Sequence, residues 1–354
     1  MPKTTITLQE IEDAVHLACR APSFHNSQPW KWVLESNTLK LFLDPDQLVA
    51  SDTSGRQALL SCGAVLDHLR VAMAAVGWIT DVDRFPNPNN RHHLADIDFR
   101  PAPGVTRTQL KAADAILSRR TDRLPFDAVP DWPAFQQLLW LAVQGRPSHV
   151  DVLDAKQRPK LSEASHLTEV LRMYDASYDA ELFWWTSQFG ATTGIPHSSL
   201  VSAAESDRVD IGRSFPVTHT RERRQQIGDD KSTVVVISAL DDTRQDILAC
   251  GETLSAVLLE ATMSGLASCT LTHLTEHPAT RDIVGTLTGH QLPQVLVRIG
   301  IAPTLDQFPP PTPRRPLSDV FRYQRGVHSQ DHCPPTVGTN SSAVENVVPP
   351  NVDT

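Results

Sequence analysis

The sequence predicts an α+β protein built from two related halves in one chain. Each half contains a long apolar helix with a Cys-Gly pair, Cys62-Gly63 in the first and Cys250-Gly251 in the second. At the same distance beyond each pair, the chain reaches a glycine suited to ending the helix, Gly77 or Gly265. The matching pairs, spacing and helix character together favour an internal duplication over coincidence.

Small residues at the Cys-Gly pairs would let the two long helices approach closely, as helices do across the twofold axis of a dimer. The expected fold is therefore an intramolecular pseudo-dimer. On this interpretation Cys62 and Cys250 are packing residues rather than nucleophiles.

The first half is expected to span residues 1–105. Apolar residues at helical spacing predict its first helix, and the alternation over 39–43 is typical of a half-buried edge strand. The sequence Pro-Ala-Pro-Gly at 101–104 breaks the chain and marks the boundary between the halves. The expected elements are a helix over 8–20, strands over 30–34 and 39–43, a long helix over 56–76 and a strand over 95–99.

The second half, residues 106–325, repeats this plan with a longer middle. Residues 161–224 are rich in aromatic and turn residues and form an insert without a counterpart in the first half. Residues 326–354 lack periodicity and are expected to be a disordered tail. The expected elements are helices over 109–117, 132–143 and 245–263 and strands over 150–153, 233–237 and 295–299.

The bulk composition excludes several classes of function. The chain has 354 residues, of which 40% are hydrophobic and 21% charged, as in ordinary globular proteins. A net charge of −9 disfavours nucleic-acid binding, which needs a basic surface, and the basic run 221–224 is interpreted as a solvated face. The N-terminus has no apolar leader, and the apolar run 234–237 is far too short to span a bilayer. We therefore expect a cytoplasmic protein that does not enter a membrane.

Metal and thiol chemistry are not expected either. Five cysteines are scattered without a CxxC pair, which argues against a disulfide framework and a zinc site. His273 and His277 have helical spacing but no third ligand nearby, and the adjacent His92 and His93 are expected in an exposed loop. The sequence also contains no phosphate-loop, serine-hydrolase or Rossmann glycine motif.

Residues 20–30 gather polar groups in a short turn between a helix and a strand: the hydroxyl of Ser23, the imidazole of His25 and the amides of Asn26 and Gln28. Such a turn could present several donors and acceptors to a planar polar ligand. The residues alone favour an ordinary turn that satisfies its own polar groups. The segment, RAPSFHNSQPW, nevertheless resembles the APSxxNxQPW motif of the FMN-dependent nitroreductase superfamily. That resemblance implies that these four residues contact FMN, with the first three holding the ring or ribityl chain.

Residues 118–126, with the sequence SRRTDRLPF, follow a predicted helix. Arg119, Arg120 and Arg123 with the hydroxyl of Thr121 could cradle a dianion, or form a solvated basic helix end. The segment resembles the RRSxRxF element with which nitroreductases begin and which binds the FMN phosphate. Thr121 stands where the family has Ser, and one extra residue precedes Phe126. The resemblance assigns Arg119 and Arg120 to the phosphate and Arg123 to the N1 side of the flavin.

Two further segments in the second half resemble the same family. Residues 263–273 are similar to its AxxxGLGS strand and loop, which implies that Thr270, Leu271 and Thr272 lie along the isoalloxazine ring. This chain has Thr272-His273 where the family often has Glu-Gly. The segment PRRPL is similar to the family's C-terminal ending, which assigns Arg314 and Arg315 to the phosphate.

The distribution of these motifs matters more than any one of them. A nitroreductase subunit carries all four, and each FMN site of its dimer takes APSxxN from the partner. Here the first half has APSxxN without RRS, and the second half has the other three but reads VQGRP at 143–147, where APSxxN is expected. We therefore expect one complete FMN site and one degenerate site in a monomeric chain. Over residues 8–325, apart from the insert, the chain resembles the Acg-type, dormancy-associated branch of the superfamily.

Two functions of different classes follow from the resemblance. The first is an FMN-dependent NAD(P)H oxidoreductase that passes electrons to a small acceptor such as a quinone or nitroaromatic. The second is a non-catalytic flavoprotein that sequesters FMN beneath a lid. The bulky groups at 181–185 and 194–196 of the insert fit either a pocket wall or such a lid. No side chain is assigned a catalytic role, because the flavin carries the chemistry in such enzymes.

Overall fold

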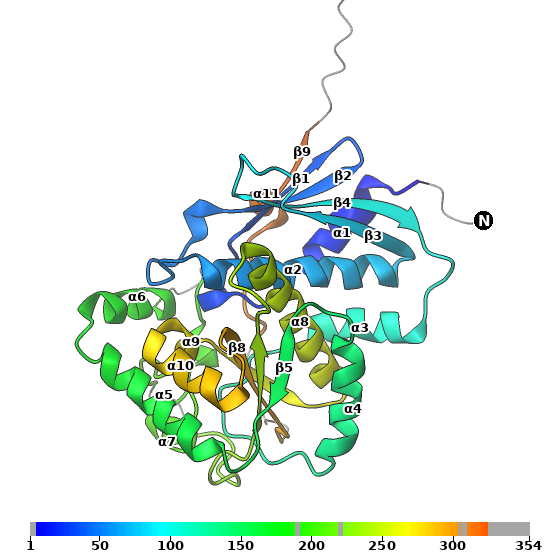
Figure 1. Cartoon of the computed structure of the whole chain (residues 1–354). Coiled ribbons are helices and arrows are strands. Elements are labelled where there is room, and N and C mark those ends of the chain that lie inside the picture. Colours follow the sequence, from blue (N-terminus) through cyan, green and yellow to red (C-terminus); the bar gives the residue numbers. More distant parts are fainter. Residues whose placement is uncertain (1–4, 188–191, 219–221, 304, 306–309, 325–354) are drawn as a thin grey trace, which may run out of the picture.

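A computed structural model describes residues 5–187, 192–218, 222–303, 305 and 310–324. It contains two β-sheets with two long helices, α2 and α8, between them (Figure 1). The mixed helix and strand content confirms the predicted α+β class. The predicted tail, 326–354, lies outside the described residues.

The first sheet has the strand order β3-β4-β2-β1-β9. Its first four strands are antiparallel, whereas β9 joins β1 in parallel. The predicted edge strand over 39–43 is β2, but the edge assignment is wrong because β2 lies between β1 and β4. The elements of this half are α1 (Leu8–Ala18), β1 (Trp30–Glu35), β2 (Thr38–Leu43), α2 (Arg56–Ala75), β3 (Trp78–Arg84) and β4 (His93–Pro101).

The second sheet is antiparallel throughout, with the order β5-β6-β8-β7. Its predicted strands and long helix are confirmed within a few residues. The elements outside the insert are α3 (Arg107–Ser118), α4 (Trp132–Val143), β5 (His149–Val152), β6 (Thr233–Ser238), α8 (Arg244–Met263), β7 (Ala267–Leu271), α9 (His273–Glu276), α10 (Pro278–Thr288) and β8 (Pro293–Gly300).

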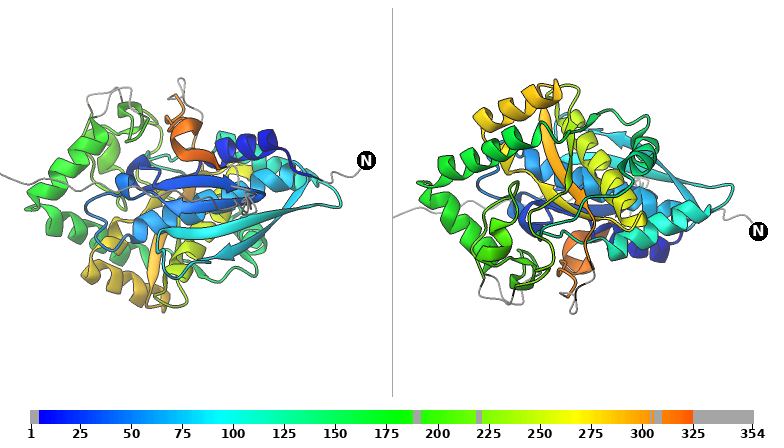
Figure 2. Two further views of the ribbon diagram at one scale, coloured as in Figure 1. Left: turned by 90° about the horizontal axis from the view of Figure 1, so that it is seen from above. Right: turned by 90° about the horizontal axis from the view of Figure 1, so that it is seen from below.

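The insert is more helical than its composition suggested. Its described residues contain α5 (Arg158–Arg172), which starts before the predicted boundary, α6 (Ala176–Thr186) and α7 (Ala203–Asp207). These helices gather at the end of the molecule away from the N-terminus in both views of Figure 2. The insert lies in the connection between β5 and β6, and these two strands still pair with each other in the second sheet.

After β8 the chain crosses back to the first sheet. The segment carries α11 (Leu317–Val320) and then β9 (Phe321–Gln324), which pairs in register with Trp32 to Glu35 of β1. In Figure 1 this segment, coloured orange, lies beside the blue strands of the first half. The second half of the chain thus contributes a strand to the sheet of the first.

The helices α2 and α8 make backbone contact through the two predicted glycines. A Cβ atom added to Gly63 would lie 2.0 Å from the carbonyl oxygen of Leu248, and one added to Gly251 would lie 2.2 Å from that of Leu60. No side chain fits at either position, so the contact requires glycine on both helices. Burial raises the pKa of the neighbouring Cys250 thiol to about 12, which suits a packing residue.

By length and composition α2 could cross a bilayer, since an 18-residue window has a mean hydropathy of 1.4. It is nevertheless the central helix of the fold, with 78% of that window buried inside the protein. Polar residues such as Asp67 and His68 interrupt the apolar run of this helix, so the sequence alone did not mark it as a candidate span. Both of these side chains are buried.

Candidate functional site

The turn between α1 and β1 has a strained backbone. His25, Asn26 and Gln28 have φ values of 51°, 58° and 54°, in the left-handed region that few residues other than glycine adopt. The Ser23 hydroxyl accepts a hydrogen bond from the backbone N–H of Gln28 at 3.0 Å. The hydroxyl of Ser61 on α2 accepts another backbone N–H of the turn at 3.1 Å. Strain of this kind persists where surrounding contacts enforce it, often at ligand sites.

The two amide side chains of the turn bind other parts of the chain. Asn26 donates through Nδ2 to the carbonyl of Gly194 in the insert at 3.0 Å. Gln28 is fully buried, donates to the carbonyl of Thr192 at 2.8 Å and accepts the backbone N–H of Arg315 at 2.9 Å. Both amides therefore fasten the insert and the C-terminal segment to the turn.

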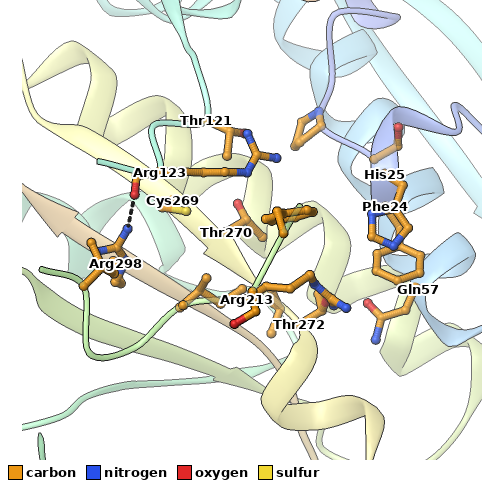
Figure 3. A pocket seen from close by; sticks show the side chains of 18 of the residues that line it. Phe24, His25, Gln57, Thr121, Arg123, Arg213, Cys269, Thr270, Thr272 and Arg298 are labelled. Atoms are coloured by element: carbon orange, nitrogen blue, oxygen red, sulfur yellow. Dashed lines mark hydrogen bonds between the residues drawn. The ribbon is translucent and has the colours of Figure 1, made fainter. Parts of the chain in front are cut away.

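A large cavity, called here the main cavity, opens beside this turn. Its volume is about 1070 Å³ when the space open to solvent at its mouth is included. Its walls come from the turn, the first part of α2, β7, β8 and the insert, as Figure 3 shows. Three of the four motifs found in the sequence meet here. Of the predicted site residues it is lined by Ser23, His25, Thr121, Arg123, Thr270, Leu271 and Thr272.

A second cavity of about 550 Å³, the arginine cavity, adjoins the main cavity and shares Ser23, His25, Thr121 and Arg123 with it. It also contains the predicted Asn26. The remaining lining side chains are dominated by four arginines that come from three distant segments, namely Arg20, Arg119, Arg120 and Arg314. The fourth motif, at the C-terminus, thus reaches the same site as the other three.

The arginine cavity is strongly cationic. Burial, followed by repulsion from Arg120 and Arg20, lowers the pKa of Arg119 to about 10. Burial and the charge of Arg119 lower the pKa of Arg314 to about 9. Within the described part of the chain, none of the cavity's arginines forms an ion pair with a carboxylate. A cluster of this kind is suited to an anionic ligand.

Several buried polar atoms around the two cavities have no hydrogen-bond partner among the described residues, including His25 Nε2, Gln57 Nε2, Thr270 Oγ1, Arg119 Nε and Arg298 Nε. Buried polar atoms normally find a partner, so these atoms could donate to or accept from a polar ligand in the cavities. Burial, and then the nearby Arg213, lowers the pKa of His25 to about 3, so its ring is neutral at physiological pH.

The insert supplies one wall of the main cavity. The guanidinium of Arg213 contacts the carboxylate of Glu276, donates to Thr272 Oγ1 at 3.1 Å and lies 5.4 Å from the centre of the Phe24 ring. Burial alone would raise the pKa of Glu276, but Arg213 lowers it to about 2. The ion pair fixes the insert against α9, the short helix that follows β7.

Arg298 of β8 also lines the main cavity, paired with Asp230 at 3.0 Å. The sequence analysis missed it together with Gln57, Arg213 and Phe215, because nothing in their local pattern marks them. Arg20 was also left out, although it directly precedes the APSxxN motif and could have been included. Four of these five side chains line the main cavity, and Arg20 lines the arginine cavity.

Two predicted residues do not line either cavity. Gln28 is committed to the backbone contacts given above. Arg315 is bound to the buried carboxylate of Asp44 at 3.0 Å and to the carbonyl of Gln28 at 3.1 Å. The structure thus brings Arg314 to the cavity and turns its neighbour away. Among the described residues there is also no cluster of three or more His, Cys, Asp or Glu side chains that could hold a metal.

No family model matches this chain. It is 57% identical to the "Putative NAD(P)H nitroreductase acg" of Mycobacterium tuberculosis over 334 residues, which cover 94% of this chain and 100% of the relative. The "Putative NAD(P)H nitroreductase Rv3131" of the same organism is 33% identical over 320 residues, covering 89% of this chain and 92% of the relative.

Solved structures show a weaker likeness. The FMN-dependent nitroreductase NfnB from Mycobacterium smegmatis, in complex with NADPH, is 19% identical with a TM-score of 0.36 and covers 61% of this chain and 99% of its own. Nitroreductase NfnB from sphigopyxis sp. strain HMH is 15% identical with a TM-score of 0.39, covering 60% and 98%. These scores are too low to carry weight, so the assignment depends on the sequence relatives. By those relatives, the chain belongs to the Acg branch of the nitroreductase family.

Proposed function

We propose that this chain is an FMN-dependent NAD(P)H oxidoreductase with one flavin site at the junction of two nitroreductase-like halves. One observation carries the proposal. Four segments far apart in the sequence line two joined cavities, one with unpartnered polar atoms and the other with unpaired arginines. FMN has a planar polar ring, which suits the main cavity, and a phosphate at the other end, which suits the arginine cavity.

The duplication is supported by topology. In the first half the strands around α2 have the order β1-β2-β4-β3, and in the second the strands around α8 have the order β5-β6-β8-β7. In both, the long helix follows the second strand and precedes the third. The reciprocal contacts of Gly63 and Gly251 relate the two helices in the same way. The proposed halves are residues 1–105 and 106–325, with 161–224 as the insert and β9 contributed to the first sheet.

The residues present fit FMN. Arg119, Arg314 and the hydroxyl of Thr121 would hold its phosphate, because buried guanidinium groups bind phosphate through paired N–H donors. Ser23 and His25 would contact the ring or ribityl chain from the first half, and 270–272 would line the ring from the second. When bound, FMN would supply the two-electron chemistry between a reduced nicotinamide and an acceptor.

Arg123 has a distinct place among these residues. It lines both cavities, and its guanidinium lies 4.9 Å from the centre of the Phe215 ring. Burial lowers its pKa, with a smaller opposing effect of Asp122. A positive charge held here stabilises negative charge on a ligand that spans the junction, and so favours the reduced form of a flavin.

The region proposed to be equivalent in the other half is filled with ion pairs. Arg146, from the segment that replaces APSxxN, donates to Asp67 Oδ1 at 3.0 Å and to the carbonyl of Glu252 at 2.9 Å. Arg84 makes two hydrogen bonds of 2.8 Å to the carboxylate of Glu252. These contacts support one FMN per chain rather than two.

Further parts of the proposal follow from the family. The acceptor is a small quinone or nitroaromatic compound, which would reach the flavin through the main cavity. Because one chain supplies both halves of the site, the protein is proposed to act as a monomer. The cytoplasm stays the predicted compartment.

One observation favours the alternative, a flavoprotein that sequesters FMN. The insert reaches both cavities through Arg213, Phe215 and Ile195, and Trp185 lies 6.3 Å from His25, ring centre to ring centre. A wall this close could exclude a nicotinamide from the flavin. The two functions differ in whether NAD(P)H reaches the ring, which can be measured directly.

The test is an anaerobic titration of the FMN-loaded protein with NADH and then NADPH, followed at the flavin absorbance band. Rapid bleaching, with recovery on adding a quinone, supports the oxidoreductase and excludes sequestration. Protein that stays yellow with both nucleotides but bleaches with dithionite supports the alternative. Protein that takes up no FMN contradicts both.

A further inference from the structure

The arginine cavity contains more positive charge than one phosphate monoester neutralises. Four guanidinium groups line it, and Arg123 reaches it from the main cavity. A phosphate monoester carries about two negative charges near neutral pH. The FMN phosphate would therefore leave about two of the four charges without a counter-ion, since the described residues offer no carboxylate partner.

The four arginines divide into an inner and an outer pair. The inner pair is Arg119, which is 6% exposed, and Arg314, whose guanidinium donates to the carbonyls of Cys19 at 2.9 Å and Arg20 at 3.0 Å. The outer pair is Arg20, which is half-buried, and Arg120, which is exposed. Exposure thus rises from the buried Arg119, through the partly exposed Arg314 and Arg20, to the exposed Arg120.

The two arginines of the outer pair line the same cavity. Burial lowers the pKa of Arg20, and the charge of Arg120 is the next largest cause. Among the described residues, Arg120 donates only to carbonyl groups, at 2.8 Å to Leu117 and at 2.9 Å to its neighbour Arg119. Two neighbouring guanidinium groups without an acid repel each other unless an anion lies between them.

We propose that the outer pair, Arg20 and Arg120, binds a second phosphate group beside that of FMN. The inference rests on the proposed function, because the inner pair is taken to hold the FMN phosphate. The second group belongs to a dinucleotide whose nucleoside extends past the exposed Arg120 into solvent. It is either the adenylate phosphate of FAD, which continues from the first phosphate, or the pyrophosphate of the nicotinamide donor.

The first experiment uses inorganic pyrophosphate as the probe. It is titrated by calorimetry into protein whose FMN occupancy has been verified by absorbance. Pyrophosphate is expected to bind, and the double substitution Arg20→Gln and Arg120→Gln is expected to weaken it about tenfold or more, as for lost hydrogen bonds between charged groups. The matched control replaces Arg91 and Arg107, both exposed and outside the cavity, by Gln. It removes the same charge and is expected to leave the affinity unchanged.

Two further measurements separate the sources. If FAD supplies the phosphate, the double substitution lowers the affinity for FAD relative to that for FMN. If the donor supplies it, the substitution raises the KM for NADPH but not for reduced nicotinamide riboside, which has no phosphate. Either result supports the second phosphate site.

Equal pyrophosphate binding by the double variant and its control, or no binding by FMN-loaded protein, overturns the inference. In that case the FMN is still bound and the proposed function stands. Failure to load FMN at all is a different result and removes the proposed function instead. Thermal unfolding of each variant verifies that it is folded before titration.

Discussion

Two regions of this molecule bury arginines in opposite ways. In the arginine cavity, Arg119 and Arg314 have no acidic partner among the described residues, and burial lowers the pKa of both. Around Glu252, by contrast, the same residue type is paired with carboxylates, and the hydrogen bond to Glu252 raises the pKa of Arg84. One region stabilises the fold by itself. The other destabilises it until an anion arrives, and so has the charge balance of a binding site.

The largest effect is expected on breaking the paired region. Glu252→Gln leaves the guanidinium of Arg84 without its carboxylate, and Arg70 loses its 3.2 Å contact. Arg84 and Arg70 are 27% and 40% exposed, so water screens part of the loss, and the expected cost is about 1.5–3 kcal/mol of unfolding free energy. Urea denaturation of the apo protein measures this loss. Glu163→Gln, at an exposed residue of α5, is the control and is expected to change stability little. An equally small effect of the Glu252 change would show that this region does not stabilise the fold.

The second prediction is that substitution in the unpaired region weakens ligand binding and leaves the stability of the fold unchanged. Arg119→Gln is expected to weaken FMN binding by about 1.5–3 kcal/mol, the usual worth of a hydrogen bond to a charged group, without lowering apo stability. Arg84→Gln should do the opposite and destabilise the fold while FMN binding persists. Fluorescence titration with FMN and urea denaturation of both variants measure the two effects. The contrast between the regions fails if both substitutions affect the same property.

The third prediction concerns pH, and its effect within a single pH unit is the smallest of the three. Burial and Arg213 lower the pKa of both His25 and His273 to about 3 from an ordinary value near 6.5. The unfolded chain therefore binds protons that the folded protein does not between pH 6.5 and 3, so stability falls as the pH falls through this window. Each histidine contributes about 1.4 kcal/mol per pH unit there. In a plot of unfolding free energy against pH, His25→Asn should lower the slope by the contribution of one proton. Denaturation at several pH values measures this slope. An unchanged slope would mean that His25 is protonated in the folded state.

The sequence predicted most of the fold because its largest elements have strong local patterns. The helices α2 and α8 are long, apolar and ended by glycine, and β6 and β8 are nearly continuous runs of branched residues. The four residues of β9 have no such pattern, and only their pairing with β1 makes them a strand. The alternation of apolar and polar residues in β2 indicates that one face of the strand is buried. Inner strands and edge strands both show this pattern, so it could not tell them apart, and the prediction of an edge strand was wrong.

The site was predicted where motifs are contiguous and missed where only folding brings residues together. Arg314 and Arg315 are adjacent and chemically equivalent, and the sequence cannot tell that the buried Asp44 binds one of them. Gln28 belongs to the motif because it builds the turn rather than because it lines the cavity. Arg213 comes from an insert whose path has no counterpart in the other half, so no pattern marked it as part of a wall.

The close contact between α2 and α8 has a consequence for how this protein can vary. In a dimer of identical subunits, one codon change alters both sides of a twofold contact at once. Here Gly63 and Gly251 are encoded by separate codons, so a mutation can change the residue on one helix and leave the residue on the other unchanged. Each side still meets the backbone of the other, which leaves neither free to accept a side chain. Because the two positions are encoded separately, the residues around each glycine can differ, while both glycines must be kept.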